Sequence, residues 1–431
     1  MRQIVRFYIL VFISKICRIV FKFTKIIPVV FKNTHRYKLW LIQFISYYRY
    51  NHRMKYELTQ HAIDVMSARA IKIEWVHIAL DFPSFHKVIS DAEELFPATD
   101  QHGYHESGPY GKFNQFRTQC MQYIAQAGGQ IKYGHSEVGN FTINGKNYEQ
   151  NEIEFLPVPV EKAAEHLMIA KWVIRNLAYE YGYNITFAPK LVAGKAGSGL
   201  HIHMRIMKEG KNQMLHNGVL SETARKAIAG MMDVAQSITA FGNKNPISYF
   251  RLVPHQEAPT NICWGDRNRS VLVRVPLGWT AKKEMCMQAN PLETFTYYDT
   301  TQKQTVEMRS PDGSADIYQL LSGLAVACRH GFEMTDALDV AKKTYVDIDI
   351  HQESNRDHLA LLGELPSSCM ASAQCLKHQR AVFEQYGVFS PAMIDGIINN
   401  LESYNDGELR ESLIRNSQDE EELLAEYFHC G

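Results

Sequence analysis

Residues 195–206 have the sequence KAGSGLHIHMRI, in which a glycine-rich lead-in is followed by alternating polar and apolar residues. Because successive side chains of a β-strand point to opposite faces, this pattern predicts one polar and one apolar face, formed by His201, His203 and Arg205 and by Ile202, Met204 and Ile206. Two imidazoles at this spacing can bind one metal ion or one polyphosphate, and arginine suits an anion. The alternative is a pair of half-exposed strand histidines without a ligand.

The regions around this stretch alternate between strand and helix signals. Strands are predicted at 131–138, 152–156, 201–206, 269–275 and 304–309, and Asn144-Gly145 marks a hairpin turn between the first two. Helices are predicted at 114–127, 161–182, 221–240 and 315–338, and the chain after residue 355 is largely helical. Strands and helices mixed in this order predict an α+β fold built on an antiparallel sheet.

The predicted hairpin carries a group of carboxylates. Glu137 leaves its first strand and Glu152 opens its second, so strand pairing can bring the two side chains together, and Glu154 shares the face of Glu152. Carboxylates gathered on one face repel one another unless a hard cation neutralises them, and Mg²⁺ or Mn²⁺ prefers such oxygen ligands. The alternative is an ordinary exposed acidic face of a sheet.

Arginine residues gather in two segments further along the chain. Residues 245–279 contain Arg251, Arg267, Arg269 and Arg274 together with Glu257, and residues 305–316 contain Glu307 and Arg309 on one strand face. Arginine among valine and leucine is expensive to bury unless it meets an anion. Because Arg269 and Arg274 have opposite parity, either a bulge intervenes or Arg269 precedes the strand proper. Structural ion pairs could explain either segment alone.

Together these segments combine metal-binding residues with several arginines. This combination is the chemistry of nucleotide-dependent phosphoryl transfer to a carboxylate, in which a metal ion bridges the phosphates and arginine stabilises the developing charge. The sequence has neither a Walker-type nor a Rossmann glycine pattern, so a P-loop would not hold the nucleotide.

The composition divides the chain into unequal parts. The 431 residues are 45% hydrophobic, with 46 Lys and Arg against 46 Asp and Glu, which suits a globular protein and argues against a dedicated nucleic-acid-binding protein. Residues 1–56 nevertheless contain twelve Lys or Arg and no Asp or Glu, so the remainder has 34 basic and 46 acidic residues, a formal charge of −12. We therefore expect a basic, aromatic-rich leader at 1–56, a transitional segment at 57–90 and one large domain at 91–431.

The cysteines and the leader bear on the location of the protein. The eight cysteines are scattered without a Cys-x-x-Cys pair, which predicts reduced thiols in a cytoplasmic protein. The apolar run at 7–14 is too short for a membrane-spanning helix and lacks a signal-peptide cleavage pattern. A basic stretch can lie on an anionic membrane surface, but we favour a poorly specified or non-native leader.

Six motifs, in order, resemble the catalytic domain of glutamine synthetase. They are HSEV (135–138), QNEIEF (150–155), GKAGSGLHIH (194–203), SYFRLVPHQEAPTN (248–261), DRNRSVLVRVP (266–276) and EMRSPDGSAD (307–316). The resemblance covers about residues 91–431 and implies an antiparallel sheet flanked by helices, forming a funnel open to ATP at one end and to glutamate at the other. It implies formation of γ-glutamyl phosphate, which ammonia then attacks to give glutamine.

The resemblance also implies roles for individual residues. Glu137 and Glu152 would bind the metal ion that activates glutamate, and His201 and Glu307 the ion that orients the nucleotide phosphates, with Mg²⁺ or Mn²⁺ at both sites. The substrate and nucleotide contacts would come from Gly197 and Arg251 for glutamate, His203 and Arg269 for the nucleotide, and Arg274 and Arg309 for glutamate or the transferred phosphoryl group. Glu257 would shield the intermediate and help to accept the ammonium proton.

The chain departs from the family pattern in three ways. The family's Glu-x-Glu strand gives one carboxylate to each metal ion, but its expected place at 77–85 offers only Asp81, so each site lacks one expected carboxylate. The N-terminal β-grasp domain, which completes the neighbouring subunit's ammonium site, is not recognisable in residues 1–90, and the adenylylated tyrosine motif is missing around 344–365. We expect a truncated or frame-shifted N-terminus, low turnover, and a homo-oligomer with intersubunit active sites if that domain is supplied.

Three alternatives to a glutamine synthetase stay open. One is a catalytically inactive relative with an assembly or regulatory role, and another is a related γ-glutamyl-amine ligase that uses a different acceptor. The third is a metal-dependent hydrolase built on the His-x-His strand. Such a hydrolase needs further metal ligands on later strands, where this chain has arginines instead.

Overall fold

The structure is a computed structural model that describes residues 75–86, 96–143, 146–254, 258–276, 300–347, 362–409 and 417–431. The chain divides into two units, residues 1–59 and 60–431, and every described residue lies in the second unit. The predicted leader at 1–56, the predicted turn at 144–145 and Glu257 lie outside the described residues.

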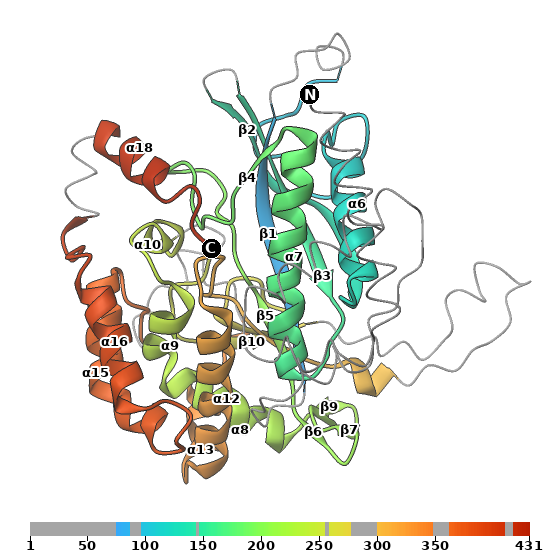
Figure 1. Ribbon diagram of the computed structural model, residues 1–431. Coiled ribbons are helices and arrows are strands. Elements are labelled where there is room, and N and C mark those ends of the chain that lie inside the picture. Colours follow the sequence, from blue (N-terminus) through green and yellow to red (C-terminus); the bar gives the residue numbers. More distant parts are fainter. Residues whose placement is uncertain are drawn as a thin grey trace, which may run out of the picture. The chain divides into compact units, whose positions relative to one another are not determined.

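An eight-stranded sheet forms the centre of the described unit (Figure 1). Its strands are β1 (Trp75–His86), β2 (Ile131–Ile143), β3 (Lys146–Phe155), β4 (Asn184–Ile185), β5 (Ile202–Arg205), β10 (Trp264–Asp266), β11 (Val273–Val275) and β12 (Val306–Met308). The strand order is β10-β11-β12-β5-β1-β3-β2, and β4 pairs with β1. Neighbouring strands are antiparallel except for β10 and β11 at the edge. The prediction of an α+β fold with an antiparallel sheet is therefore confirmed, with one parallel pair added.

The sheet has one apolar and one polar face because strand pairing places apolar residues opposite apolar residues and polar residues opposite polar ones. Met204 on β5 is the partner of Val306 on β12, and Ile202 is the partner of Met308, and all four side chains are almost completely buried. The intervening residues of these strands are polar and face the other way. The alternation predicted for residues 201–206 thus places a hydrophobic face against the helices and a polar face opposite to it.

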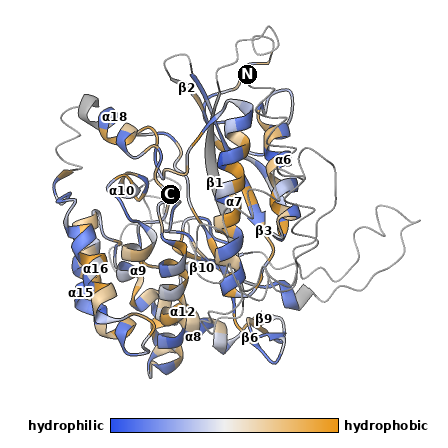
Figure 2. Cartoon of the chain, in the orientation of Figure 1, coloured by the Kyte–Doolittle hydropathy of each residue, from blue (hydrophilic) through white to orange (hydrophobic). Residues whose placement is uncertain are grey.

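Two helices cover the β1–β3–β2 part of the sheet. α6 (Asn114–Gln126) packs on β2, and α7 (Val160–Tyr181) packs on β1 and on α6. Hydrophobic and hydrophilic residues alternate along α7 in Figure 2, as the predicted amphipathic helix at 161–182 requires. The helix ends at Gly182, whose φ of 72° is a left-handed conformation that glycine adopts without strain.

The remaining large helices pack together beside the sheet (Figure 1). They are α8 (Glu222–Asp233), α9 (Ala235–Gly242), α12 (Ile317–Glu333), α13 (Ala337–Lys343), α15 (Cys369–Glu384) and α16 (Pro391–Glu402). The single helix predicted at 221–240 is wrong in one respect, because the backbone at Val234 (φ −109°, ψ 18°) divides it into α8 and α9. α15 begins where the buried carboxylate of Asp406 accepts hydrogen bonds from the amides of Cys369 and Met370.

Shorter elements complete the description. They are α10 (Ser248–Arg251), α18 (Ser417–Glu426), the 3₁₀ helix η1 (Thr300–Lys303), and two small sheets formed by β6 (Met207–Lys208) with β7 (Lys211–Asn212) and by β8 (Leu215–His216) with β9 (Val219–Leu220). Strand β1 lies within the segment predicted as transitional, yet it pairs with β3 and β5 in the middle of the sheet. The sheet therefore extends to the N-terminal side of the boundary predicted at residue 91.

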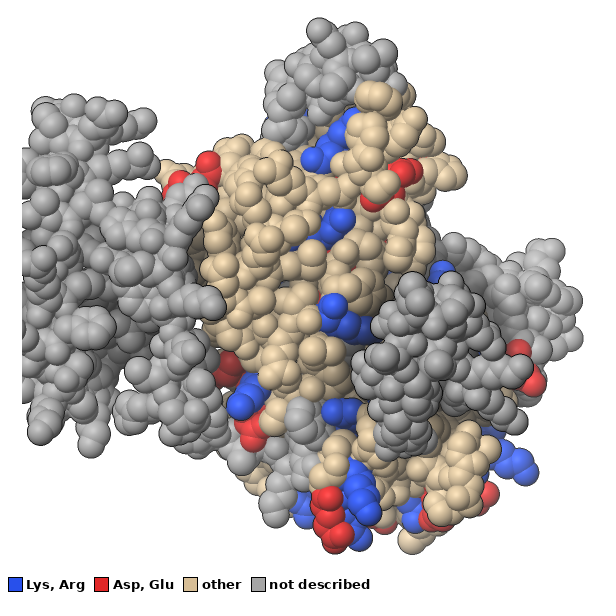
Figure 3. Space-filling model, turned by 90° about the vertical axis from the view of Figure 1, so that its right-hand side faces the viewer, with Lys and Arg blue, Asp and Glu red and all other residues tan. Residues whose placement is uncertain are grey.

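The surface of the described residues carries charges of both signs. On the face drawn in Figure 3, Lys and Arg side chains are separated by wide areas of other residues, and Asp and Glu side chains also occur. Among the described residues, no helix combines the length and the apolar character needed to cross a membrane.

Candidate active site

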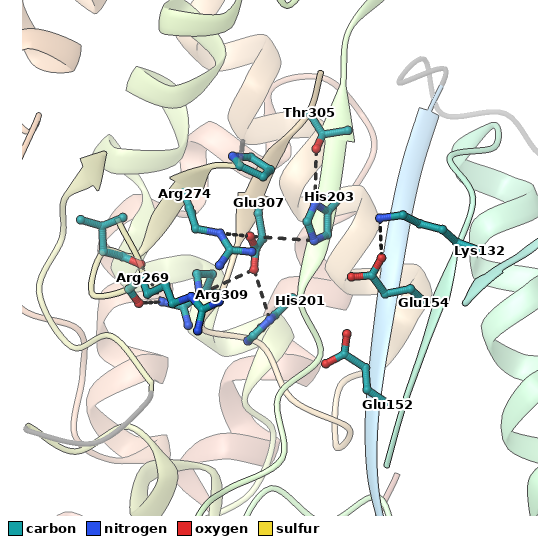
Figure 4. A network of polar contacts seen from close by, with 12 residues as sticks. Lys132, Glu152, Glu154, His201, His203, Arg269, Arg274, Thr305, Glu307 and Arg309 are labelled. Atoms are coloured by element: carbon teal, nitrogen blue, oxygen red, sulfur yellow. Dashed lines mark hydrogen bonds and ion pairs between the residues drawn. The ribbon is translucent and has the colours of Figure 1, made fainter. Parts of the chain in front are cut away.

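The polar face of the sheet carries two clusters of ionisable residues, one on the strands before β1 in the strand order and one on the strands after it; Figure 4 shows the first cluster, around Glu307, together with Glu152 of the second. The arginine group comprises Glu307 and the basic residues around it, which are His201, His203, Arg274 and Arg309. The carboxylate group comprises His135, Glu137 and Glu152. Strands β5, β11 and β12 position most of the first group, and strands β2 and β3 position the second.

Glu307 is the centre of the arginine group and has only 1% of its surface exposed. Its Cα is paired with that of His203 on β5 and with that of Arg274 on β11, and paired residues on one sheet face are close neighbours. Its carboxylate lies 2.6 Å from Arg274 Nε, 3.2 Å from His201 Nδ1, 3.6 Å from Arg309 Nε and 3.9 Å from His203 Nε2. One buried carboxylate is thus surrounded by four basic side chains.

The charges of this group set its protonation states. Burial by itself raises the pKa of Glu307, but the neighbouring histidines and Arg274 hold that pKa well below its ordinary value, so the side chain is ionised. Burial lowers the pKa of His201 to about 4 in spite of the contact with Glu307. A neutral His201 keeps a nitrogen lone pair, which is the form of imidazole that binds metal ions.

Arg309 links this group to the segment before β11. Its guanidinium donates hydrogen bonds to the carbonyl oxygens of Arg269 and of Val271, and its amide donates to the carbonyl oxygen of Leu272. Strand β11 begins at Val273, so Arg269 precedes the strand proper, which was one of the two predicted alternatives. The Arg269 side chain is exposed and remains able to reach a ligand.

Arg251 and the glycine-rich loop form a closely packed unit beside His201. The Arg251 guanidinium is 5% exposed and donates to the carbonyl oxygens of Ser310 (2.8 Å) and Arg309 (3.2 Å). A Cβ at Gly197 would lie 2.9 Å from Arg251 Cγ, and one at Gly199 would lie 2.8 Å from His201 Nε2. Only glycine permits this approach, so the glycines of the loop allow Arg251 to pack closely against it.

Strand pairing and a bulge produce the carboxylate group. His135 on β2 is the Cα partner of Glu152 on β3, and the register shifts between Ser136 and Asn140, so Glu137 lies in the irregular part of β2. His135 Nε2 lies 3.7 Å from a Glu152 oxygen, and His135 Nδ1 lies 3.6 Å from a Glu137 oxygen. One potential ligand atom from each of the three residues falls within 4.8 Å of the others. The predicted pair of carboxylates is therefore brought together.

Sequence reasoning missed His135 as a member of this group. The signal was the spacing of His135 and Glu137, because residues two apart share a face of a regular strand. Glu154, by contrast, does not join the group: its carboxylate lies 2.6 Å from Lys132 Nζ and accepts a hydrogen bond of 3.1 Å from the Tyr133 hydroxyl. Glu154 is thus paired with a lysine, whereas Glu152 lies beside His135.

The two groups differ in how well they fit a divalent metal ion. Two carboxylates and an imidazole form a suitable donor set for such an ion, and among the residues that the structure describes this is the one triad of such ligands so close together. His201 and Glu307 also lie within 3.2 Å of each other, but Arg274 already contacts the same carboxylate at 2.6 Å. An ion there would have to share Glu307 with an arginine.

Strand β1 occupies the position between these groups where the Glu-x-Glu strand was expected. On β1, Asp81 is the Cα partner of Glu152, Ala79 is the partner of Glu154, and His77 is the partner of His203. Asp81 is the single acidic residue in 75–86. It is paired with Glu152 of the carboxylate group, whereas the residue paired with His203 of the arginine group is His77.

Comparison with known proteins gives one family. The family "Glutamine synthetase, catalytic domain" matches residues 75–409. The chain is 30% identical to the glutamine synthetases of Mycolicibacterium smegmatis over 297 residues, covering 68% of this chain and 55% of that one, and of Thermococcus kodakarensis over 292 residues, covering 67% and 58%. The chain spans about half the length of the curated relatives that it matches.

Solved structures share the fold at lower identity. A structure described as "CryoEM Plasmodium falciparum glutamine synthetase" has a TM-score of 0.59 at 18% identity and covers 78% of this chain and 73% of that one. Another, described as "Apo GmaS without ligand", has a TM-score of 0.58 at 20% identity and covers 77% and 68%.

Proposed function

The chain belongs to the glutamine synthetase family, and we propose that it is an ATP-dependent ligase that joins ammonia to glutamate through γ-glutamyl phosphate. The observation that carries the proposal is the polar face of one sheet, which places a metal-type donor set and a buried arginine group on either side of a single strand. Phosphoryl transfer to a carboxylate needs both, because negative charge develops on the transferred group and on the acceptor.

The carboxylate group is the proposed site of the ion that activates glutamate. Glu137 and Glu152 would hold Mg²⁺ or Mn²⁺ there, and the bound ion would neutralise the side-chain carboxylate of glutamate so that it can attack the terminal phosphate of ATP. Gln150 supports this geometry from the same strand, because its side-chain amide donates to the carbonyl oxygen of Gly197 at 3.0 Å and its carbonyl accepts from the amide of Gly139 at 3.0 Å. The hairpin and the glycine-rich loop are thereby joined.

The arginine group is the proposed phosphate-binding side. His201 and Glu307 would hold a nucleotide-linked ion, with one carboxylate fewer than the family provides. The remaining roles follow the family pattern: Arg274 and Arg309 for glutamate or the transferred phosphoryl group, His203 and Arg269 for the nucleotide, Gly197 and Arg251 for glutamate, and Glu257 for the ammonium proton. A homo-oligomer and a cytoplasmic location remain predictions from the sequence and from the family.

The test is formation of glutamine by the purified 431-residue chain with ATP, glutamate and ammonium. We expect glutamate-dependent release of phosphate at a rate about 100- to 1,000-fold below an ordinary turnover of roughly 10 per second, because the family pattern predicts a further carboxylate at each metal site where residues 77–85 offer only Asp81. A folded chain that releases no phosphate in response to glutamate would favour the inactive relative. Product formation with methylamine but not with ammonium would favour the γ-glutamyl-amine ligase.

A further inference from the structure

We infer that His135 is a further protein ligand of the ion held by Glu137 and Glu152, and that this imidazole shifts the preference of the site towards a first-row transition ion such as Mn²⁺ over Mg²⁺. The inference rests on the proposed function only in taking the carboxylate group as a metal site. It adds a residue and a metal preference that the family resemblance does not supply.

The spacing of the three side chains matches common coordination. Two ligand atoms bound to one ion at about 2.1 Å lie roughly 3.0 Å apart when adjacent and roughly 4.2 Å apart when opposite. His135 Nε2 lies 3.7 Å from a Glu152 oxygen, and one ring nitrogen of His135 and one oxygen of each glutamate fall within 4.8 Å of one another. The Glu137 oxygen lies 3.6 Å from Nδ1, so the Glu137 side chain, which is 16% exposed, has to rotate towards Nε2 to share the ion.

The hydrogen bond on the other ring nitrogen selects the tautomer that a metal ligand needs. His135 Nδ1 lies 3.0 Å from the carbonyl oxygen of Ser136, and a carbonyl oxygen can only accept, so Nδ1 carries the proton. Nε2 then presents its lone pair on the side of Glu152. A backbone carbonyl bound to the second nitrogen is the usual support of a metal-binding histidine.

Aromatic neighbours hold the ring of His135 in place. The His105 ring stacks on it with centroids 4.2 Å apart and an interplanar angle of 20°, and the Tyr133 ring is near parallel at 5.5 Å. The backbone amide of His105 donates to the same Ser136 carbonyl oxygen at 2.9 Å. The ring and its acceptor are therefore fixed before any ion binds, which reduces the entropy lost on coordination.

The rival explanation is that a protonated His135 acts as the counter-ion of both carboxylates. Its two nitrogens lie 3.6 Å and 3.7 Å from Glu137 and Glu152, which suits weak ion pairs equally well. The two explanations differ in the metal they allow. Mg²⁺ prefers oxygen ligands, whereas transition ions accept imidazole nitrogen, so only a ligand role predicts that removing the nitrogen weakens Mn²⁺ binding more than Mg²⁺ binding.

The decisive measurement is electron spin echo modulation of Mn²⁺ bound to the full chain without ATP or glutamate. We expect modulation from a directly bound ¹⁴N nucleus in the wild-type protein and its loss in His135→Phe, a variant that keeps a stacked ring without a nitrogen. Calorimetric titration should show Mn²⁺ affinity falling at least about tenfold in His135→Phe while Mg²⁺ affinity changes far less. The matched control is His105→Phe, which alters the neighbouring ring and should preserve both the modulation and the affinity.

A second variant tests the selectivity in the opposite direction. His135→Glu replaces the nitrogen with a third carboxylate and should shift the ratio of Mg²⁺ to Mn²⁺ affinity towards Mg²⁺. Wild-type Mn²⁺ binding without ¹⁴N modulation would overturn the inference, as would equal losses of both ions in His135→Phe. If His135→Phe does not fold, the loss of modulation is measured in His135→Glu instead, because His201 at the other proposed site could also contribute ¹⁴N modulation to the wild-type spectrum. Because no turnover is measured, nitrogen ligation without glutamine formation would refute the proposed function alone.

Discussion

The arginine group and the carboxylate group lie on the same face of one sheet but differ in their ratio of acidic to basic side chains. In the first, one carboxylate, Glu307, is surrounded by four basic side chains at 2.6–3.9 Å. In the second, two carboxylates share one imidazole at 3.6 and 3.7 Å. The basic side chains around Glu307 neutralise it, whereas the carboxylate group combines two carboxylates with one imidazole. The first group is therefore suited to stabilising the fold, and the second to binding a cation.

The largest expected effect breaks the arginine group. Glu307→Gln should lower the free energy of unfolding by roughly 3 kcal/mol, because removing one partner of a buried ion pair leaves the others uncompensated. Urea unfolding without metal ions would measure the loss. The control is Glu333→Gln, which removes an exposed carboxylate bound to Arg329 at 3.1 Å and should have a far smaller effect. Similar losses in both variants would mean that Glu307 has no special structural role.

The second effect concerns metal binding and compares two residues of one strand. Glu152→Gln should weaken Mn²⁺ binding at least about 100-fold because a ligand is lost. Glu154→Gln should change it less than about threefold, because Lys132 at 2.6 Å already neutralises Glu154 and the residue is outside the triad. Calorimetry on both variants is the measurement. If Glu154→Gln weakened Mn²⁺ binding more than Glu152→Gln, the metal site would lie at Glu154 rather than at Glu152.

A smaller effect tests the geometry of the arginine group rather than its charge. Arg274→Lys keeps the positive charge but loses the planar guanidinium whose Nε lies 2.6 Å from Glu307, so we expect a loss of about 1–2 kcal/mol in the free energy of unfolding. Arg269→Lys is the matched substitution at an exposed site before the same strand and should leave stability nearly unchanged. Equal stability of both variants would show that charge alone holds Glu307.

The smallest expected effect concerns the pH dependence of stability, and it comes from a histidine on a helix rather than from the arginine or carboxylate group. Burial lowers the pKa of His166 on α7 from 6.5 to about 4, so between these values the unfolded chain binds a proton that the folded chain does not. Stability from this residue is present above pH 6.5 and is lost as the pH falls towards 4. Between pH 7.5 and 5.5 the wild type should lose about 1 kcal/mol more than His166→Phe. Parallel pH profiles would contradict this assignment.

The sequence predicted the elements that depend on local patterns. Alternation in residues 201–206 and the glycine after residue 181 were sufficient because period and capping are written into adjacent residues. The motifs that resemble glutamine synthetase also predicted that Glu137 and Glu152 meet. The break of a helix at Val234 was not foreseen, because no proline or glycine marks it.

Features that depend on register could not be predicted in the same way. The four contacts of Glu307 require β5, β11 and β12 to pair in one alignment, and a shift of one residue would turn Glu307 to the opposite face. The bulge between Ser136 and Asn140 that accompanies the carboxylate group has no signal of its own in the sequence. Strand β1 lay in a segment predicted as transitional because the composition changes character after it.

The central position of β1 sets a length for any molecule that uses both groups. Neighbouring strands of a sheet are about 4.8 Å apart, and β1 alone separates β3 from β5, so these two strands stand roughly 10 Å apart across the sheet. Their registers on β1 add to this separation, because Glu152 is opposite Asp81 whereas His203 is opposite His77, four residues away. A single ammonium or phosphate ion can occupy one side at a time. A ligand that contacts both groups at once must span this separation, and the position of β1 therefore sets a minimum length for such a ligand.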